Sequence, residues 1–249
     1  MELFGVVNAS ADSLNEDSIV DGPESTARRA RSLLADGADA FDLGGQGSTF
    51  KATRRSEADE WASLAAALPT LVGTGRPVSV DTWRPSLMRR ALDSGATWIN
   101  AAEGLQDDEM LAVAADFGCP IVAPFLSGPD PLNLQVVRHR DPVSVIVEFF
   151  EATIDRAKRF GIEGNLVLDP GTGFAPHDWP WEERFVYQRQ VYGELDRLRV
   201  FDLPLYIALP WKDTAQHDEL LEIIVRGRPE YGRAHYPAKI RAAERAATP

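Results

Sequence analysis

Residues 3–10 read LFGVVNAS, a short apolar run that ends in the polar residue Asn8. The run has the length of a buried strand, and no glycine-rich fingerprint such as G-x-G-x-x-G follows it. An open, doubly wound sheet that binds nucleotides normally carries such a fingerprint after its first strand. Its absence here favours a closed barrel over an open sheet.

Seven further short apolar runs follow, separated by segments whose apolar residues recur about every 3.6 positions. Helix start signals open four of these segments, at Pro23, Ser56, Pro85 and Pro142. Eight such βα units in 249 residues predict an α/β fold, a (β/α)8 TIM barrel that forms a single domain over residues 1–249. The strands are expected at residues 3–7, 40–43, 77–80, 97–99, 120–123, 165–168, 205–208 and 231–234.

The composition limits the partners of the chain. With 38 Asp and Glu against 26 Lys and Arg, the formal net charge is −12, which repels polyphosphate backbones and anionic lipids. Nucleic acid and membranes are therefore not expected as partners. The single cysteine, Cys119, allows no internal disulfide, and no signal peptide or membrane-spanning apolar stretch is visible, so we expect a cytoplasmic location.

Polar residues stand at or after the ends of most expected strands. In a barrel of this kind the reacting groups gather at the mouth formed by those ends. Each such residue alone is equally explained as a turn or cap residue, but several of them together can read the donors and acceptors of a flat heterocycle. The residues are Asn8, Asp42, Asp81, Asn100, Asp169, Lys212, Arg233 and His235.

Several motifs that contain these residues resemble the dihydropteroate synthase family. The likeness extends from Leu3 to about His235, and it rests on the order and spacing of the motifs together. The motifs are FGVVNASADS at 4–13, DLGG at 42–45, SVDT at 79–82, WIN at 98–100 and LDPGTGF at 168–174.

The resemblance implies a reaction and a pterin site. In that family, p-aminobenzoate attacks the methylene carbon of 6-hydroxymethyl-7,8-dihydropterin pyrophosphate, and pyrophosphate leaves. By the same resemblance, Asp81, Asn100, Asp169 and Lys212 would hold the pterin ring.

The resemblance also implies a pyrophosphate site. Asn8 would bind pyrophosphate and Mg²⁺, the implied cofactor, while Arg233 and His235 match an Arg-x-His motif that holds pyrophosphate. The catalytic set would then be Asn8, Lys212, Arg233 and His235. The family further implies a homodimer.

The chain departs from the family pattern on the side of the second substrate. Phe50 stands where an arginine is usual, Pro210-Trp211-Lys212 replaces Ser-Arg-Lys, and Ala175-Pro176 replaces a segment with a lysine. Arg54 or Arg55 could supply the missing charge, although solvated surface arginines are an equal alternative. Two hypotheses therefore stand level, a synthase and a divergent paralogue that binds a pterin with altered or no activity.

A methyltetrahydrofolate:corrinoid methyltransferase is a further alternative. The Arg233-x-His235 motif argues against it, because a methyl carrier has no pyrophosphate to hold, and no cobalamin-binding module is visible. No zinc site is expected, because the remaining histidines lack metal-ligand spacing. An aromatic cluster is expected on one helix, as core or as a dimer surface. Its members are Trp179, Trp181, Phe185, Tyr187 and Tyr192.

Overall fold

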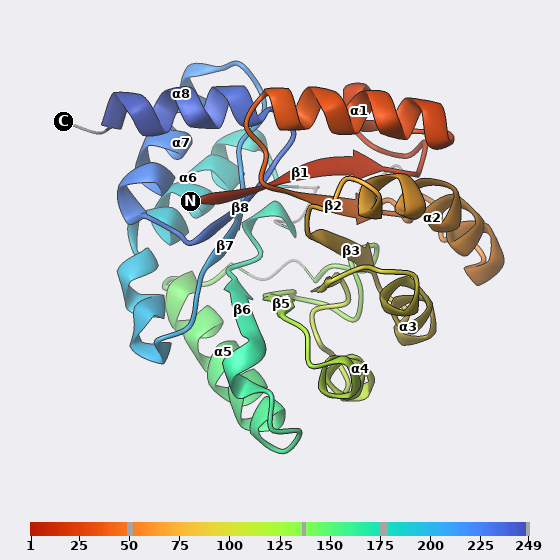
Figure 1. The fold of residues 1–249 in the computed structure, drawn as a ribbon. Helices are drawn as coiled ribbons and strands as arrows, with labels where there is room; N and C mark the ends of the chain where they lie inside the picture. The colour runs from red at the N-terminus through yellow and green to blue at the C-terminus, as the bar shows by residue number, and fades with distance from the viewer. Residues whose placement is uncertain (49–51, 136–137, 175–178, 248–249) are drawn as a thin grey trace.

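The eight strands form a parallel barrel, as predicted (Figure 1). This computed structural model describes residues 1–48, 52–135, 138–174 and 179–247. The strands pair in the order β6-β5-β4-β3-β2-β1-β8-β7, and a bridge between Leu168 and Leu205 nearly closes the ring. The strands are β1 (Glu2–Asn8), β2 (Ala40–Gly44), β3 (Val78–Thr82), β4 (Trp98–Ala101), β5 (Ile121–Pro124), β6 (Leu166–Asp169), β7 (Tyr206–Ala208) and β8 (Tyr231–Ala234).

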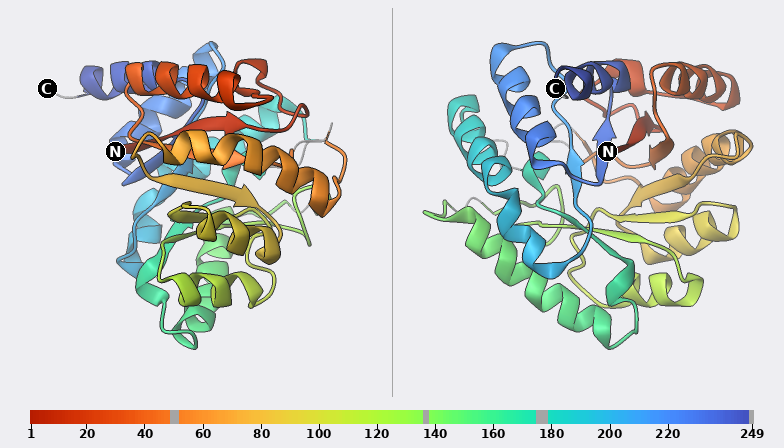
Figure 2. Two further views of the ribbon diagram at one scale, coloured as in Figure 1. Left: turned by 45° about the vertical axis from the view of Figure 1, so that its right-hand side comes forward. Right: turned by 60° about the vertical axis from the view of Figure 1, so that its left-hand side comes forward.

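The helices lie outside the strands, as the two views of Figure 2 show. The four predicted helix start signals are confirmed. Three helices begin at the predicted prolines. The Ser56 side chain caps a fourth helix, where its hydroxyl oxygen accepts from the Asp59 backbone N–H at 3.1 Å. Within the described ranges, no helix combines the length and apolar character needed to cross a membrane. The helices are α1 (Pro23–Ala35), α2 (Glu57–Val72), α3 (Pro85–Asp93), α4 (Glu109–Phe117), α5 (Pro142–Lys158), α6 (Trp181–Gly193), α7 (Ala215–Gly227) and α8 (Pro237–Ala247).

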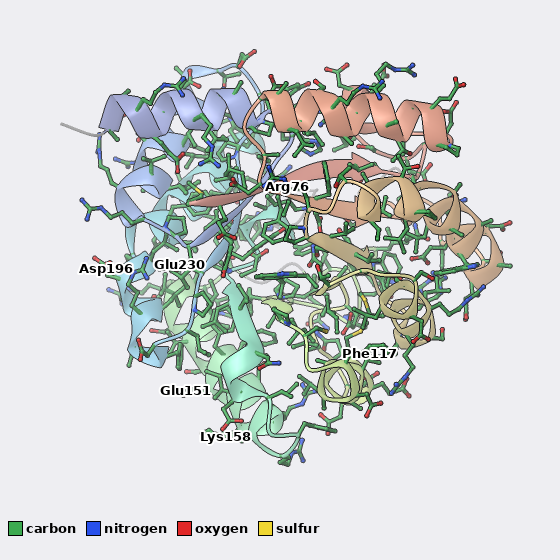
Figure 3. All side chains as sticks on the ribbon, in the orientation of Figure 1. Arg76, Phe117, Glu151, Lys158, Asp196 and Glu230 are labelled. Carbon is green, nitrogen blue, oxygen red and sulfur yellow. The ribbon has the colours of Figure 1, made fainter. Side chains whose placement is uncertain are left out.

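Two apolar clusters hold this architecture together, and strand alternation separates them. On β1, Leu3 and Val7 pack outward against the helices, whereas Phe4 points into the barrel. Glu151 and Lys158 lie on the exposed side of α5, away from both clusters (Figure 3). The outer cluster therefore joins strands to helices, and the inner one fills the barrel.

The inner cluster forms a floor toward the N-terminal ends of the strands. The Phe4 ring meets Trp98 and Tyr206 edge-on, with centroid distances of 5.0 and 5.5 Å. Because side chains alternate, a residue two positions after a floor residue also points inward. The polar residues placed in this way are the buried Asp42 after Ala40, Asn100 after Trp98 and Asp169 after Val167, and the partly buried Arg233 after Tyr231.

Several of the strands extend beyond their predicted ends. Asn8, Asp81 and Asn100 were expected after the strands, but each belongs to one, because the parallel ladder continues through polar residues. Asp81, for example, is in register with Gly44 on one side and Asn100 on the other. Arg233 lies within β8, whose bounds match the predicted range 231–234. These side chains are therefore fixed by the sheet and not by loops.

Candidate functional site

A cavity of about 330 Å³ lies at the C-terminal mouth of the barrel. It contains five of the predicted site residues, while Asn100 and Asp169 lie in the buried polar layer around Arg233. Closure of the barrel thus brings together residues from distant parts of the chain, as the sequence predicted. The five that line the cavity are Asn8, Asp81, Lys212, Arg233 and His235.

Arg233 lies at the centre of the polar layer. Its Nε donates to Asp42 Oδ2 at 2.5 Å and its Nη2 donates to Asp81 Oδ2 at 3.1 Å. Asp42 is fully buried, and Asn100 Nδ2 lies 3.3 Å from its Oδ1. Burial alone would lower the pKa of Arg233, but Asp42 and Asp81 raise it above its ordinary value, so the guanidinium stays charged. The expectation that Arg233 only faces an anion is therefore incomplete, because it also neutralises two carboxylates.

Asp81 and Asp169 are poised between two protonation states. Burial raises the pKa of each to about 7, while Arg233 opposes that shift. Asp81 Oδ1 has no hydrogen-bond partner among the described residues, and Asp169 Oδ1 accepts from the Gly171 backbone N–H at 2.8 Å. These carboxyls can therefore take up the N–H groups of a heterocycle with little competition from the protein.

The turn after Asp169 depends on glycine. Gly171 has a φ of 66°, and a Cβ there would overlap the carbonyl oxygen of Phe125. A side chain at this position would displace the turn and the backbone N–H that orients Asp169.

Asn8 and His235 form a second part of the site. Burial, then Arg233 and Arg29, lower the pKa of His235 to about 3, so the imidazole is neutral at pH 7, and its Nδ1 has no partner in the described part of the chain. Asn8 Nδ2 donates to the hydroxyls of Ser13 and Ser18, at 3.0 and 2.8 Å. Arg233 and Arg29 therefore lie near an imidazole nitrogen without a partner, an arrangement that can bind an anion.

The Asn8 side chain is compatible with a magnesium ion that is held mainly by a ligand. Its amide nitrogen donates to the two serines, so Oδ1 is the atom of this side chain that could coordinate an ion. Among the described residues, no group of three or more His, Cys, Asp or Glu side chains could form a metal site. Mg²⁺ commonly takes one or two protein oxygens and completes its shell with phosphate oxygens and water, so a single Asn oxygen fits it.

The opposite wall of the cavity is aromatic and cationic. Trp181 of α6 stacks on His217 of α7 with a centroid distance of 4.5 Å, and Trp211 lies 5.7 Å from the His235 ring. Lys212 places its Nζ 5.5 Å from the centroid of the Trp211 ring. The predicted aromatic helix is confirmed from Trp181 onward, and part of it lines the cavity rather than only the core.

The hypothesis that Arg54 or Arg55 supplies charge to the cavity is wrong. Arg54 pairs with Asp130 at 2.5 Å, and Arg55 donates to the carbonyl oxygens of Ala9 and Gly45. Neither lines the cavity, because both are engaged in fixing loops. Phe50, Ala175 and Pro176 lie outside the described residues.

Three features of the site were not assigned from the sequence. The pairing of Asp42 with Arg233 is the first of them, because nothing local in the sequence relates these two residues. Arg184 lines the cavity together with Trp181, three residues before it on the same helix face. Glu103, a buried loop acid, carried no pattern that could have identified it.

Comparisons with known proteins agree with this geometry. Residues 4–210 match the family model described as pterin binding enzyme. Dihydropteroate synthase type-2 of Escherichia coli is 32% identical over 242 residues, covering 97% of this chain and 86% of that protein, and the type-1 protein of the same species is 29% identical over 258 residues, covering 97% and 91%. Dihydropteroate synthase of Thermus thermophilus in complex with 4-aminobenzoate has a TM-score of 0.81 at 28% identity, covering 98% of this chain and 92% of that one. The chain therefore belongs to the pterin-binding enzyme family, with dihydropteroate synthases as its relatives.

Proposed function

We propose that this chain condenses 6-hydroxymethyl-7,8-dihydropterin pyrophosphate with p-aminobenzoate to give 7,8-dihydropteroate and pyrophosphate. In this transfer a bond forms between the amine nitrogen and the methylene carbon, the carbon–oxygen bond to pyrophosphate breaks, and the nitrogen loses a proton. The observation that carries the proposal is the pair of buried carboxyls, Asp81 and Asp169, poised near neutrality around Arg233 in one mouth.

The polar layer would bind the pterin. Asp81 and Asp169 would accept ring N–H groups, and the Asn100 amide, which already donates to Asp42, would offer its oxygen as a further acceptor. Lys212 would balance a ring carbonyl oxygen from the rim. Because the acids stand on strands, they would hold the ring in one orientation without ordering a loop.

Asn8, Arg233 and His235 would bind the pyrophosphate. Charge grows on this group as the carbon–oxygen bond breaks, and fixed positive groups stabilise that charge. Mg²⁺, when bound with the pyrophosphate, would neutralise part of the same charge. The neutral His235 could donate an N–H to a phosphate oxygen, and the anion would in turn raise the pKa of the imidazole.

A divergent paralogue that binds a pterin without this reaction is the second candidate. The observation that favours it is the wall formed by Pro210, Trp211 and Lys212, where the family resemblance implies Ser-Arg-Lys. The homodimer, which the family resemblance implies, stays a prediction. The cytoplasmic location and the single-domain organisation, which the sequence itself suggests, also stay predictions.

Calorimetric titration with the pterin pyrophosphate and Mg²⁺, followed by p-aminobenzoate and a pyrophosphate-release assay, tests the proposal. We expect binding, and release that depends on both substrates. Binding without release would establish the paralogue, and no binding would contradict the pterin site. An Asp196→Asn variant, altered at an exposed residue far from the mouth, is the control preparation (Figure 3).

A further inference from the structure

Arg184 on α6 is a partly buried cation to which no described residue supplies a counter-ion. Its guanidinium lines the cavity, its Nε is buried without a hydrogen-bond partner, and no carboxylate in the described part of the chain pairs with it. Burial lowers the pKa of Arg184, and no neighbouring acid offsets the shift. A desolvated cation without a partner costs stability, so its presence in a cavity points to a ligand.

Three acids of α6 and α7 are paired with cations other than Arg184. They therefore leave the Arg184 guanidinium available, although α6 and α7 are both rich in acidic residues. The pairs are Glu183 with Arg138 at 2.8 Å, Glu219 with Arg189 at 2.8 Å and Asp218 with Lys239 at 2.9 Å.

Several neighbours complete a site around Arg184. Trp181, Arg184 and Gln188 are spaced three and four residues apart on one face of α6, and all three line the cavity. Burial, then Lys212 and Lys239, lower the pKa of His217, and Arg184 contributes to the same shift. Positive groups thus converge beside the Trp181–His217 stack.

The two halves of the cavity have opposite chemistry, which orients any acceptor that lies between them. Asp81 lines the cavity from the strand side, whereas Arg184 lines it from α6. A flat acceptor can lie against Trp181 and Trp211 with its anion toward Arg184 and its amine toward the pterin half.

We infer that Arg184 binds the anionic end of the second substrate, an arylamine. The inference rests on the proposed function for the identity of the acceptor. Arg184 acts through ground-state binding of that anion, so it sets affinity and specificity and takes no part in bond making.

The test is the dissociation constant of 4-aminobenzoate for the whole chain, with 6-hydroxymethylpterin and pyrophosphate present so that no turnover occurs. Charge-assisted hydrogen bonds contribute about 1.5–3 kcal/mol, so Arg184→Gln should weaken 4-aminobenzoate by about 10- to 100-fold. Arg184→Lys should weaken it less. Arg189→Gln, which removes an exposed cation from the same helix, should leave the constant unchanged.

Neutral 4-aminobenzamide separates charge recognition from general damage to the wall. We expect it to bind the wild type and Arg184→Gln equally. We also expect the melting temperature of Arg184→Gln to equal or exceed that of the wild type, because the substitution removes an uncompensated cation.

Two results would overturn the inference. One is equal binding of 4-aminobenzoate by the wild type and Arg184→Gln. The other is a loss of affinity for 4-aminobenzamide in Arg184→Gln that is as large as the loss for 4-aminobenzoate. Since the test measures binding alone, its outcome is separate from that of the pyrophosphate-release assay. If 4-aminobenzoate binding depends on Arg184 but no pyrophosphate is released, only the proposed reaction is rejected. If pyrophosphate is released but 4-aminobenzoate binding does not depend on Arg184, only this inference is rejected.

Discussion

The two walls of the cavity are built in different ways. The acidic wall consists of side chains on β2, β3, β4 and β6, held by the strand ladder and joined through Arg233. The opposite wall consists of α6 and the segment after β7, with Trp181, Arg184 and Trp211 as its members. Side chains on a rigid sheet keep their geometry when neighbouring loops change. The comparison indicates that one substrate site can be retained while the other is rebuilt.

The largest effect is expected from removing the cation that holds the acidic wall together. Arg233→Met leaves Asp42, which is fully buried, without its partner. Breaking a buried ion pair from one side costs about 3–5 kcal/mol, so we expect the free energy of unfolding to fall by that amount. Chemical denaturation measures it, with the exposed Arg76→Met as the control (Figure 3).

A double variant distinguishes an ion-pair effect from lost packing. Asp42→Leu combined with Arg233→Met removes both charges of this pair. We expect it to recover part of the lost stability, because Asp81 still lacks Arg233. If the double variant is no more stable than Arg233→Met, the acidic wall does not depend on this charge balance.

The acidic wall was largely predictable from the sequence, and the physical reason is periodicity. Asp81, Asn100 and Asp169 each stand at the end of a short apolar run, and parallel strands bring such ends to one mouth. Six strands were predicted to end one or two residues before they do, because polar residues inside a barrel continue the strand ladder. The pairing of Asp42 with Arg233 was missed, since nothing local relates two residues 191 positions apart.

The next largest effect is expected on the affinity for the pterin, and it tests whether the acidic wall binds that ring. Asp169→Asn removes one carboxylate acceptor, and we expect it to weaken 6-hydroxymethylpterin by about 10- to 100-fold, the loss of one charged hydrogen bond. Calorimetry measures the constant, with Asp196→Asn as the control. Unchanged affinity would place the pterin elsewhere in the cavity.

The binding of the pterin should also depend on pH. Asp81 and Asp169 have pKa values raised to about 7, and each accepts ring N–H groups more strongly when it is ionised. Affinity should therefore fall as the pH drops below about 7, by up to about tenfold per unit for each group, and level off above it. Titrations across this range test the sign, and an affinity that rises toward acid pH would contradict it.

The second wall could not be predicted to the same extent. Its arginine lies on a helix in a segment where the family motif is lost, and a lone Arg on a helix is more often a solvated surface residue. Only the tertiary arrangement reveals that the neighbouring acids are paired elsewhere and that Arg184 faces the cavity.

The smallest effect concerns Glu103, in the loop after β4, an acid beside the acidic wall that lacks a cation of its own. Burial, then Asp107 and Asp81, raise its pKa from 4.5 to about 8, and neither carboxyl oxygen has a hydrogen-bond partner among the described residues. Between these two values the folded state binds more protons than the unfolded state. The free energy of unfolding should therefore fall as pH rises through this window, by up to about 1.4 kcal/mol per unit for this group.

Glu103→Gln should remove that part of the slope and stabilise the protein near pH 8 relative to the wild type, because a neutral amide is buried at all pH values. Denaturation at several pH values measures it, and the exposed Glu151→Gln on α5 should keep the wild-type slope (Figure 3). If Glu103→Gln retains the full slope, the dependence belongs to Asp81 and Asp169 alone. The acids next to Arg233 would then be the ones that couple the pH response of the fold to that of the pterin site.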